Sequence, residues 1–144
     1  MEKEISRDEL SILVVGRPAP QGSKSYKGNQ RFVEASKYLP AWRKAIIGEV
    51  KQAFNSTQDV RRFTEPVRVE IVFFMDRPRN PKWVYPATTP DLDKLVRGVF
   101  DALTQANAWV DDCLVVDLTA REVWTGETPD TYPVSGARVS IFKK

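Results

Sequence analysis

The spacing of apolar residues between Pro90 and Asn107 constrains the fold of this chain more than any other feature. These residues recur at i, i+3, i+4, i+7 and i+11, which places them on one face of an α-helix. They are Leu92, Leu95, Val96, Val99 and Leu103. Asp91 directly follows a proline and suits the N-cap position. The sequence therefore predicts an amphipathic helix that starts at Asp91 and ends near Gln105.

A second helix and four strands are predicted around it. Residues 11–17 form a short β-branched run typical of a strand, and residues 67–75 read as a strand that is central at its far end. Residues 114–124 alternate and predict a half-buried strand. Residues 137–142 predict a final strand, which we expect to pair with its predecessor as an antiparallel hairpin with a long turn. Residues 35–54 predict the other helix.

Periodicity indicates which side chains face the core. In the helix of residues 35–54, Pro40 falls in the first turn or at a break. The core stripe of this helix comprises Leu39, Trp42, Ile46, Ile47, Val50 and Phe54. In the strand of residues 114–124, the side chains expected to point inward are Leu114, Val116, Leu118 and Ala120.

The order β-α-β-α-β-β predicts an α/β (α+β) fold, a small mixed four-stranded sheet with two main helices. Right-handed crossovers place both helices on the same side of the sheet. One face is then uncovered, which favours dimerisation. A chain of 144 residues predicts one domain. We expect a flexible leader or edge over residues 1–10 and a single domain over residues 11–144.

Composition excludes several classes of protein. No stretch approaches the roughly 20 apolar residues of a membrane span, and the charged start lacks the apolar core of a signal peptide. We therefore expect a cytoplasmic protein with no membrane partner. The chain has no histidine, and its single cysteine, Cys113, can form neither an internal disulfide nor a cysteine-rich zinc site. We expect Cys113 to be a small buried hydrophobe.

Charge is unevenly distributed. The chain carries +3, but residues 17–44 contain seven basic residues and one acid, a net charge of +6. This asymmetry fits a polyanion held beside an acidic site, and it equally fits a solvated basic face. Lys24, Lys27 and Arg31 lie in a glycine-containing loop over residues 20–33. That loop could contact phosphates, or it could be a plain polar turn.

A second basic loop covers residues 76–90. It contains four prolines and the two aromatic residues Trp83 and Tyr85. Its candidate DNA-binding residues are Arg77, Arg79 and Lys82. Basic residues beside exposed aromatics suit nucleic acid, through phosphate contact and stacking. A proline-stiffened connection whose tryptophan packs on the domain explains the composition as well, and both interpretations stay open.

The carboxylates at the two ends of the predicted helix of residues 91–105 are the strongest candidates for catalytic side chains in this chain. Asp91 and Asp93 are two residues apart, but Asp91 can lie in the extended lead-in and swing toward Asp93. If loop geometry brings in Asp112, three carboxylates converge, and hard oxygen ligands predict Mg²⁺ or Mn²⁺. Such a site would promote hydrolysis of a phosphodiester. Taken singly, these residues equally fit a helix cap and a polar turn.

Arg97 lies four residues after Asp93 on the same helix face. Its guanidinium could offset charge in the transition state. It could also form only a helix ion pair, worth a few tenths of a kcal/mol.

The run PDLDKLVRGVFDALTQANAWVDDCLVVDL closely resembles the signature of the RusA family of Holliday junction resolvases. The matching positions are Asp91 and Asp93, Arg97, Asp101-Ala102-Leu103, Trp109 and Asp111-Asp112. The segments PAPQGSKSY and WRKAI resemble the loop and the first helix of the family. The resemblance implies a small homodimer that binds four-way DNA junctions and cuts two strands of like polarity with Mg²⁺. It places Asp91, Asp93 and Asp112 at the essential acids and gives Asp111 a lesser role.

Two positions depart from the family pattern. The best-known form of the motif has a catalytic lysine where this chain has Arg97, which keeps the charge but cannot deprotonate. Many members also have a lysine late in the third strand, where this chain has Glu122 beside Arg121. The resemblance also implies a bacterial setting that is frequently phage-borne. Two other functions remain open, a flap- or fork-type branched-DNA nuclease and a non-catalytic junction-binding protein.

Overall fold

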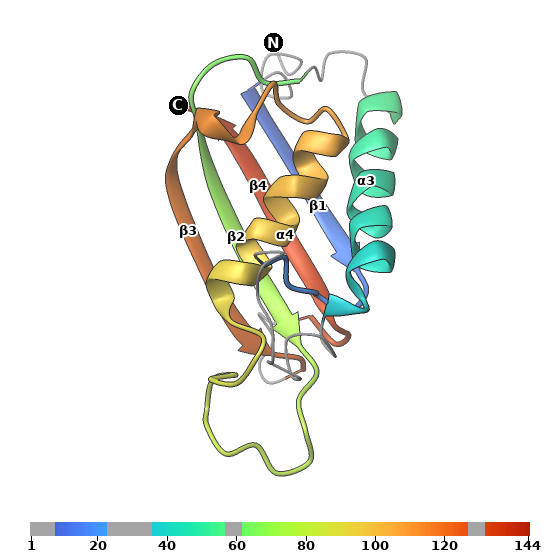
Figure 1. Ribbon diagram of the computed structural model, residues 1–144, viewed down its shortest axis with the longest axis vertical. Coiled ribbons are helices and arrows are strands. Elements are labelled where there is room, and N and C mark those ends of the chain that lie inside the picture. Colours follow the sequence, from blue (N-terminus) through green and yellow to red (C-terminus); the bar gives the residue numbers. More distant parts are fainter. Residues whose placement is uncertain (1–7, 23–35, 57–61, 127–131) are drawn as a thin grey trace.

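The computed structural model describes residues 8–22, 36–56, 62–126 and 132–144. These residues form a mixed four-stranded sheet with two long helices (Figure 1). In chain order the elements are β1 (Glu9–Val15), α3 (Leu39–Ser56), β2 (Val67–Met75), α4 (Leu92–Gln105), the 3-10 turn η1 (Asp112–Leu114), β3 (Val115–Trp124) and β4 (Gly136–Lys143). The predicted fold class and element order are confirmed.

The sheet has the strand order β1-β4-β2-β3. β4 is antiparallel to both β1 and β2, whereas β3 is parallel to β2 and forms one edge. The predicted hairpin between the last two strands is therefore wrong. Parallel β2 and β3 require a crossover, which α4 supplies. The other side of β2 is left for β4, which returns between β1 and β2.

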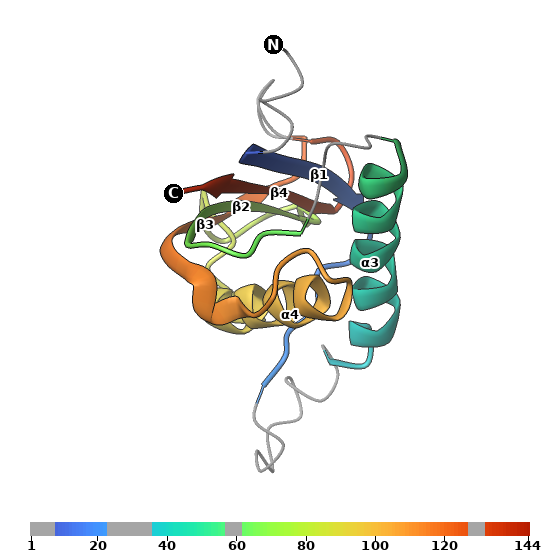
Figure 2. The same ribbon diagram turned by 90° about the horizontal axis from the view of Figure 1, so that it is seen from above.

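Both helices pack on one side of the sheet (Figure 2). α4 lies across that face, and α3 runs beside α4 along the β1 side. Buried side chains from the two layers form a single core. The largest fully buried side chains of this core include Trp42, Trp109, Phe73, Ile46, Ile71 and Leu95. No helix in the described part of the chain covers the opposite face, in agreement with the expected open face.

The helix boundaries follow from local signals. α3 begins at Leu39 with Pro40 in its first turn, where a missing N–H costs nothing. α4 ends at Gln105, as predicted, and Asn107 takes a φ of 61° just beyond it. Asparagine tolerates this left-handed conformation, so it can stop a helix without glycine. Neither helix, nor any other helix among the described residues, is long and apolar enough to cross a membrane.

Two expectations at the start of β3 are wrong. The register slips, so that Val67 pairs with Val115 and Arg68 pairs with Asp117. The skipped Val116 is 60% exposed rather than inward. Cys113 is also exposed rather than buried, because it lies in η1 before the strand enters the sheet.

Candidate active site

The N-terminus of α4 presents two carboxylates to solvent. Asp91 is the N-cap residue, with an extended backbone (φ −70°, ψ 144°), but its side chain makes no capping hydrogen bond. The Asp93 side chain is 80% exposed and forms an ion pair with Lys94 Nζ at 3.8 Å. An ion pair of that exposure contributes little. Both carboxylates are therefore accessible to an incoming ligand.

The segment that follows β1 crosses α4 close to these aspartates. The backbone N–H of Gln21 donates to the Lys94 carbonyl at 3.0 Å, and Arg43 Nη2 donates to Gln21 Oε1 at 2.6 Å. Gly98 allows this close approach, because a Cβ atom there would lie 2.8 Å from the Ala19 carbonyl oxygen. The chain thus enters the lysine-rich loop from beside the first turns of α4.

A cleft of about 240 Å³ opens next to the same helix end. Its lining includes Arg17, Asp76, Thr88, Thr89 and Pro90. Arg17 stacks over the Tyr38 ring, with its guanidinium carbon 3.9 Å from the ring centroid. The Arg17 guanidinium is the cation in this lining and suits a phosphate group. The Asp76 carboxylate lines the same cleft, and the Thr88 hydroxyl donates to the Thr89 carbonyl at 3.2 Å. In the sequence, Arg17 is only one of the basic residues of segment 17–44. Its position beside residues 88–90 depends on the tertiary fold and could not be predicted.

Glu122 is an acid near this site that the sequence did not assign. It pairs with Phe73 on the sheet face that α4 covers, and its Oε2 atom is buried without a hydrogen-bond partner among the described residues. Burial, and then the charge of Asp91, raise the pKa of the Glu122 carboxyl to about 7. Glu122 and Asp91 are therefore close enough for their charges to interact, although they are far apart in the sequence.

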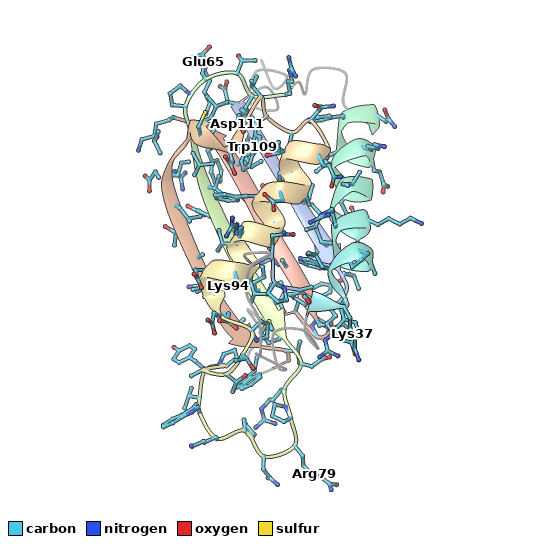
Figure 3. The ribbon with its side chains drawn as sticks, viewed as in Figure 1. Lys37, Glu65, Arg79, Lys94, Trp109 and Asp111 are labelled. Carbon is cyan, nitrogen blue, oxygen red and sulfur yellow. The ribbon has the colours of Figure 1, made fainter. Side chains whose placement is uncertain are left out.

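Asp111 and Asp112 lie at the other end of α4 (Figure 3). The helix has 14 residues, and at 1.5 Å per residue it separates the two pairs of aspartates by about 20 Å. The buried Trp109 holds this end in place. Its Nε1 donates to Thr104 Oγ1 at 2.8 Å, and its ring meets Phe100 edge-on at 5.4 Å. Both aspartates are exposed.

Cys113 shares the acidic surroundings of η1. Its thiol donates a hydrogen bond to the Asp111 carboxylate, which together with partial desolvation and the charges of Asp111 and Asp112 raises the pKa of the thiol. A raised pKa keeps the thiol protonated and unreactive. The protonated Cys113 thiol is therefore a poor nucleophile despite its exposure.

The structure does not bring Asp112 beside Asp91 and Asp93 within one chain. Over the described ranges, no group of three or more histidine, cysteine, aspartate or glutamate side chains could hold a metal ion. The accessible oxygens of Asp91 and Asp93 nevertheless fit Mg²⁺, which takes one or two carboxylates and completes its shell with water and phosphate. A single chain supplies only part of the expected ligand set.

The predicted cationic residues fall into two groups. Lys24, Lys27 and Arg31 lie outside the described residues. Arg77, Arg79 and Lys82 belong to the loop between β2 and α4, which projects past the end of the sheet and has Arg79 near its tip (Figure 3).

Arg97 lies on the exposed side of α4, one turn after Asp93. Among the described residues, no ion pair joins Arg97 to Asp93. The ion-pair interpretation of this arginine is therefore not supported, and its guanidinium is accessible to a ligand.

Comparison with known proteins shows which family the chain belongs to. The model of the family described as "Endodeoxyribonuclease RusA" matches residues 16–132. The chain is 33% identical over 99 residues to a crossover junction endodeoxyribonuclease RusA of Escherichia coli O139:H28, covering 68% of this chain and 71% of the relative. It is 32% identical, with the same coverage, to the proteins of that name from Escherichia coli K12 and Shigella sonnei. The chain belongs to the RusA family of endodeoxyribonucleases, the Holliday junction resolvases that its aspartate motif resembles.

Proposed function

We propose that this chain resolves four-way DNA junctions by Mg²⁺-dependent phosphodiester hydrolysis, as a homodimer whose two sites each draw carboxylates from both chains. The observation that carries the proposal is the accessible Asp91–Asp93 pair at the start of α4, within the segment that the RusA family model matches. Mn²⁺ is the expected substitute for Mg²⁺, because both accept hard oxygen ligands.

The separation of the aspartates along α4 supports a shared site. Asp112 belongs to the same motif, but within one chain it begins η1, beyond the C-terminal end of α4, whereas Asp93 lies in the first turn of that helix. β3 is an edge strand and exposes Val116 and Leu118, which are 60% and 43% exposed. Unpaired apolar edges favour pairing with another strand. If β3 pairs with its two-fold mate in antiparallel fashion, η1 of one chain lies beside the α4 N-terminus of the other.

In such a site the protein residues have separate roles. Asp91 and Asp93 of one chain and Asp112 of the other hold the metal ion. When bound, Mg²⁺ neutralises phosphate charge and activates water. Arg97 lies one helical turn from Asp93 and stabilises charge on the reacting phosphate. Arg17, in the neighbouring cleft, holds a second phosphate of the same strand and fixes its direction.

Two sites in a two-fold dimer suit a four-way junction, which itself presents two strands of like polarity for cutting. Basic residues of the loop between β2 and α4 (Arg77, Arg79 and Lys82) then contact the arms. Binding that rests on phosphate contacts weakens steeply with salt.

Cleavage of a synthetic mobile four-way junction tests the function. The purified protein should make paired, symmetric cuts with Mg²⁺ and none with EDTA. Flap and fork substrates, added as competitors, separate a resolvase from a general branched-DNA nuclease. Tight junction binding without cutting under any divalent ion would show a non-catalytic binding protein and contradict the proposal.

Substitution of the aspartates tests the assignment of the site. Asp93→Asn and Asp112→Asn should each lower the cleavage rate by at least about a hundredfold, because each removes a metal ligand, and should leave junction affinity nearly unchanged. Glu70→Gln is the matched control, since Glu70 is an exposed carboxylate on the sheet face away from α4. If either asparagine variant cuts at the normal rate, its aspartate is not a ligand.

A further inference from the structure

The loop between β2 and α4 exposes an unusual amount of apolar surface beside the candidate active site. Trp83, Val84 and Tyr85 are 51%, 78% and 66% exposed. The loop spans residues 76–90, projects beyond the sheet, and leads directly into Asp91 (Figure 1). Three consecutive large apolar residues in solvent are costly unless a partner covers them. Their position places that partner next to the α4 N-terminus.

The backbone of this loop is tied to the sheet, whereas the side chains of Trp83, Val84 and Tyr85 are exposed. The buried Trp124 donates from Nε1 to the Trp83 carbonyl at 3.0 Å. The Tyr85 carbonyl accepts from the Ala87 N–H at 2.7 Å, and Thr125 N–H donates to the Met75 carbonyl at 2.9 Å where the loop leaves β2. Anchoring through the backbone fixes the base of the loop and leaves the aromatic rings outward. A rigid aromatic contact loses little entropy on binding.

The charge around the rings indicates what they bind. Arg77, Arg79 and Lys82 share the loop with a single acid, Asp76. Lys82 Nζ lies 5.3 Å from the Trp83 ring centroid, so positive charge and aromatic surface occupy the same patch. A partner with flat apolar faces and a polyanionic backbone matches both features, and nucleic acid bases on a phosphate chain have them. A purely apolar protein surface would not complement the positive charge of this loop.

We propose that Trp83 and Tyr85 stack on DNA bases exposed at the branch point, next to the strand held at Asp91 and Asp93. The proposal rests on the proposed function, because a duplex hides its bases and a branch point exposes them. The loop is then a structure-selective element, which favours branched DNA over plain duplex without reading sequence.

Tryptophan fluorescence tests the contact directly. The four tryptophans of the chain are Trp42, Trp83, Trp109 and Trp124, and only Trp83 is more than 6% exposed. Adding a four-way junction in EDTA, where no cutting occurs, should quench the emission of Trp83. Trp83→Phe should remove most of this quenching and retain most of the affinity, since phenylalanine still stacks.

Affinity measurements supply the matched comparison. Trp83→Ala and Tyr85→Ala should each weaken junction binding about tenfold or more, as expected for loss of one stacked base. Val84→Ala is the control, because valine is the most exposed of the three and has no ring to stack; its affinity should change less than twofold. Trp83→Ala keeps the carbonyl that Trp124 binds, so thermal unfolding should stay close to that of the parent protein.

Base-analogue fluorescence locates the contact. A 2-aminopurine at the branch point should respond to the parent protein and not to the Trp83→Ala, Tyr85→Ala double variant, whereas the same analogue inside an arm should respond to neither. Normal junction affinity in the alanine variants overturns the stacking proposal and leaves junction resolution standing. A change in oligomeric mass with unchanged affinity also overturns it, because the rings would then contact a second copy. Failure of the parent protein to bind or cut junctions removes the proposed function itself.

Discussion

Glu122 lies beside Asp91 with one carboxyl oxygen buried and no partner for it among the described residues. Its neighbours on β3 and β2 come from different parts of the chain, so its surroundings are set by tertiary structure. The alternating pattern of the sequence placed Glu122 in a strand, but it did not indicate how deeply the Glu122 carboxyl group would be buried. The raised pKa of about 7 follows from this burial and from the Asp91 charge.

Stability should therefore depend on pH through Glu122. Between pH 4.5 and about 7 the folded Glu122 holds a proton that the unfolded chain has released, so the free energy of unfolding falls as pH rises through this window. Because the group is partly exposed, we expect a loss of about 1 kcal/mol between pH 5 and pH 8. The chain has no histidine to obscure this change.

Urea unfolding in EDTA at pH 5 and pH 8 measures the effect. Glu122→Gln should flatten the dependence, and Glu70→Gln should preserve it because Glu70 is exposed on the other face. An equal pH dependence in the parent protein and Glu122→Gln would show that Glu122 titrates normally.

At the scale of elements, helices and strands could be predicted from the periodicity of apolar residues, whereas the pairing of the strands could not. The stripe from Leu92 to Leu103 specifies α4 locally, and Asn107 supplies its stop signal. The position of β4 between β1 and β2 depends on contacts between residues far apart in sequence, so a hairpin with β3 was the simpler expectation. The exposure of Val116 follows from a register slip that no local pattern records.

The crossing of residues 18–21 over α4 gives a prediction at this scale. Gly98→Ala places a methyl group 2.8 Å from the Ala19 carbonyl oxygen, so the backbone must shift. Overpacking of about 1–3 kcal/mol exceeds the helix gain of about 1 kcal/mol. We expect the free energy of unfolding to fall by about 1 kcal/mol, with weaker junction cleavage because Asp93 moves with the helix.

Gly48→Ala is the matched control. Gly48 lies inside α3, and a Cβ atom there meets nothing within 4 Å. This substitution should raise the free energy of unfolding by about 0.5–1 kcal/mol through helix propensity. Stabilisation of the Gly98→Ala variant by a similar amount would mean that the segment does not press on the helix.

At the scale of the whole molecule, the sequence identified the aspartates and the family but not their arrangement. Asp91, Asp93 and Asp112 stand in a recognisable motif, yet their convergence inside one chain is prevented by the length of α4 between them. The length of α4 can be estimated from the sequence, and at 1.5 Å per residue it implies that Asp91 and Asp93 lie about 20 Å from Asp112. The way in which a second chain brings its Asp112 to Asp91 and Asp93 depends on the dimer interface, which a single sequence does not specify.

Mixing two inactive variants tests the shared site most directly. A dimer of one Asp93→Asn chain and one Asp112→Asn chain contains one site with both substitutions and one intact site, if each site spans two chains. The mixture, unfolded together and refolded, should then regain up to about half of the singly nicked product expected of one working site. If each site lies within one chain, both sites in the mixed dimer are damaged, and a mixture as inactive as its components would contradict the account.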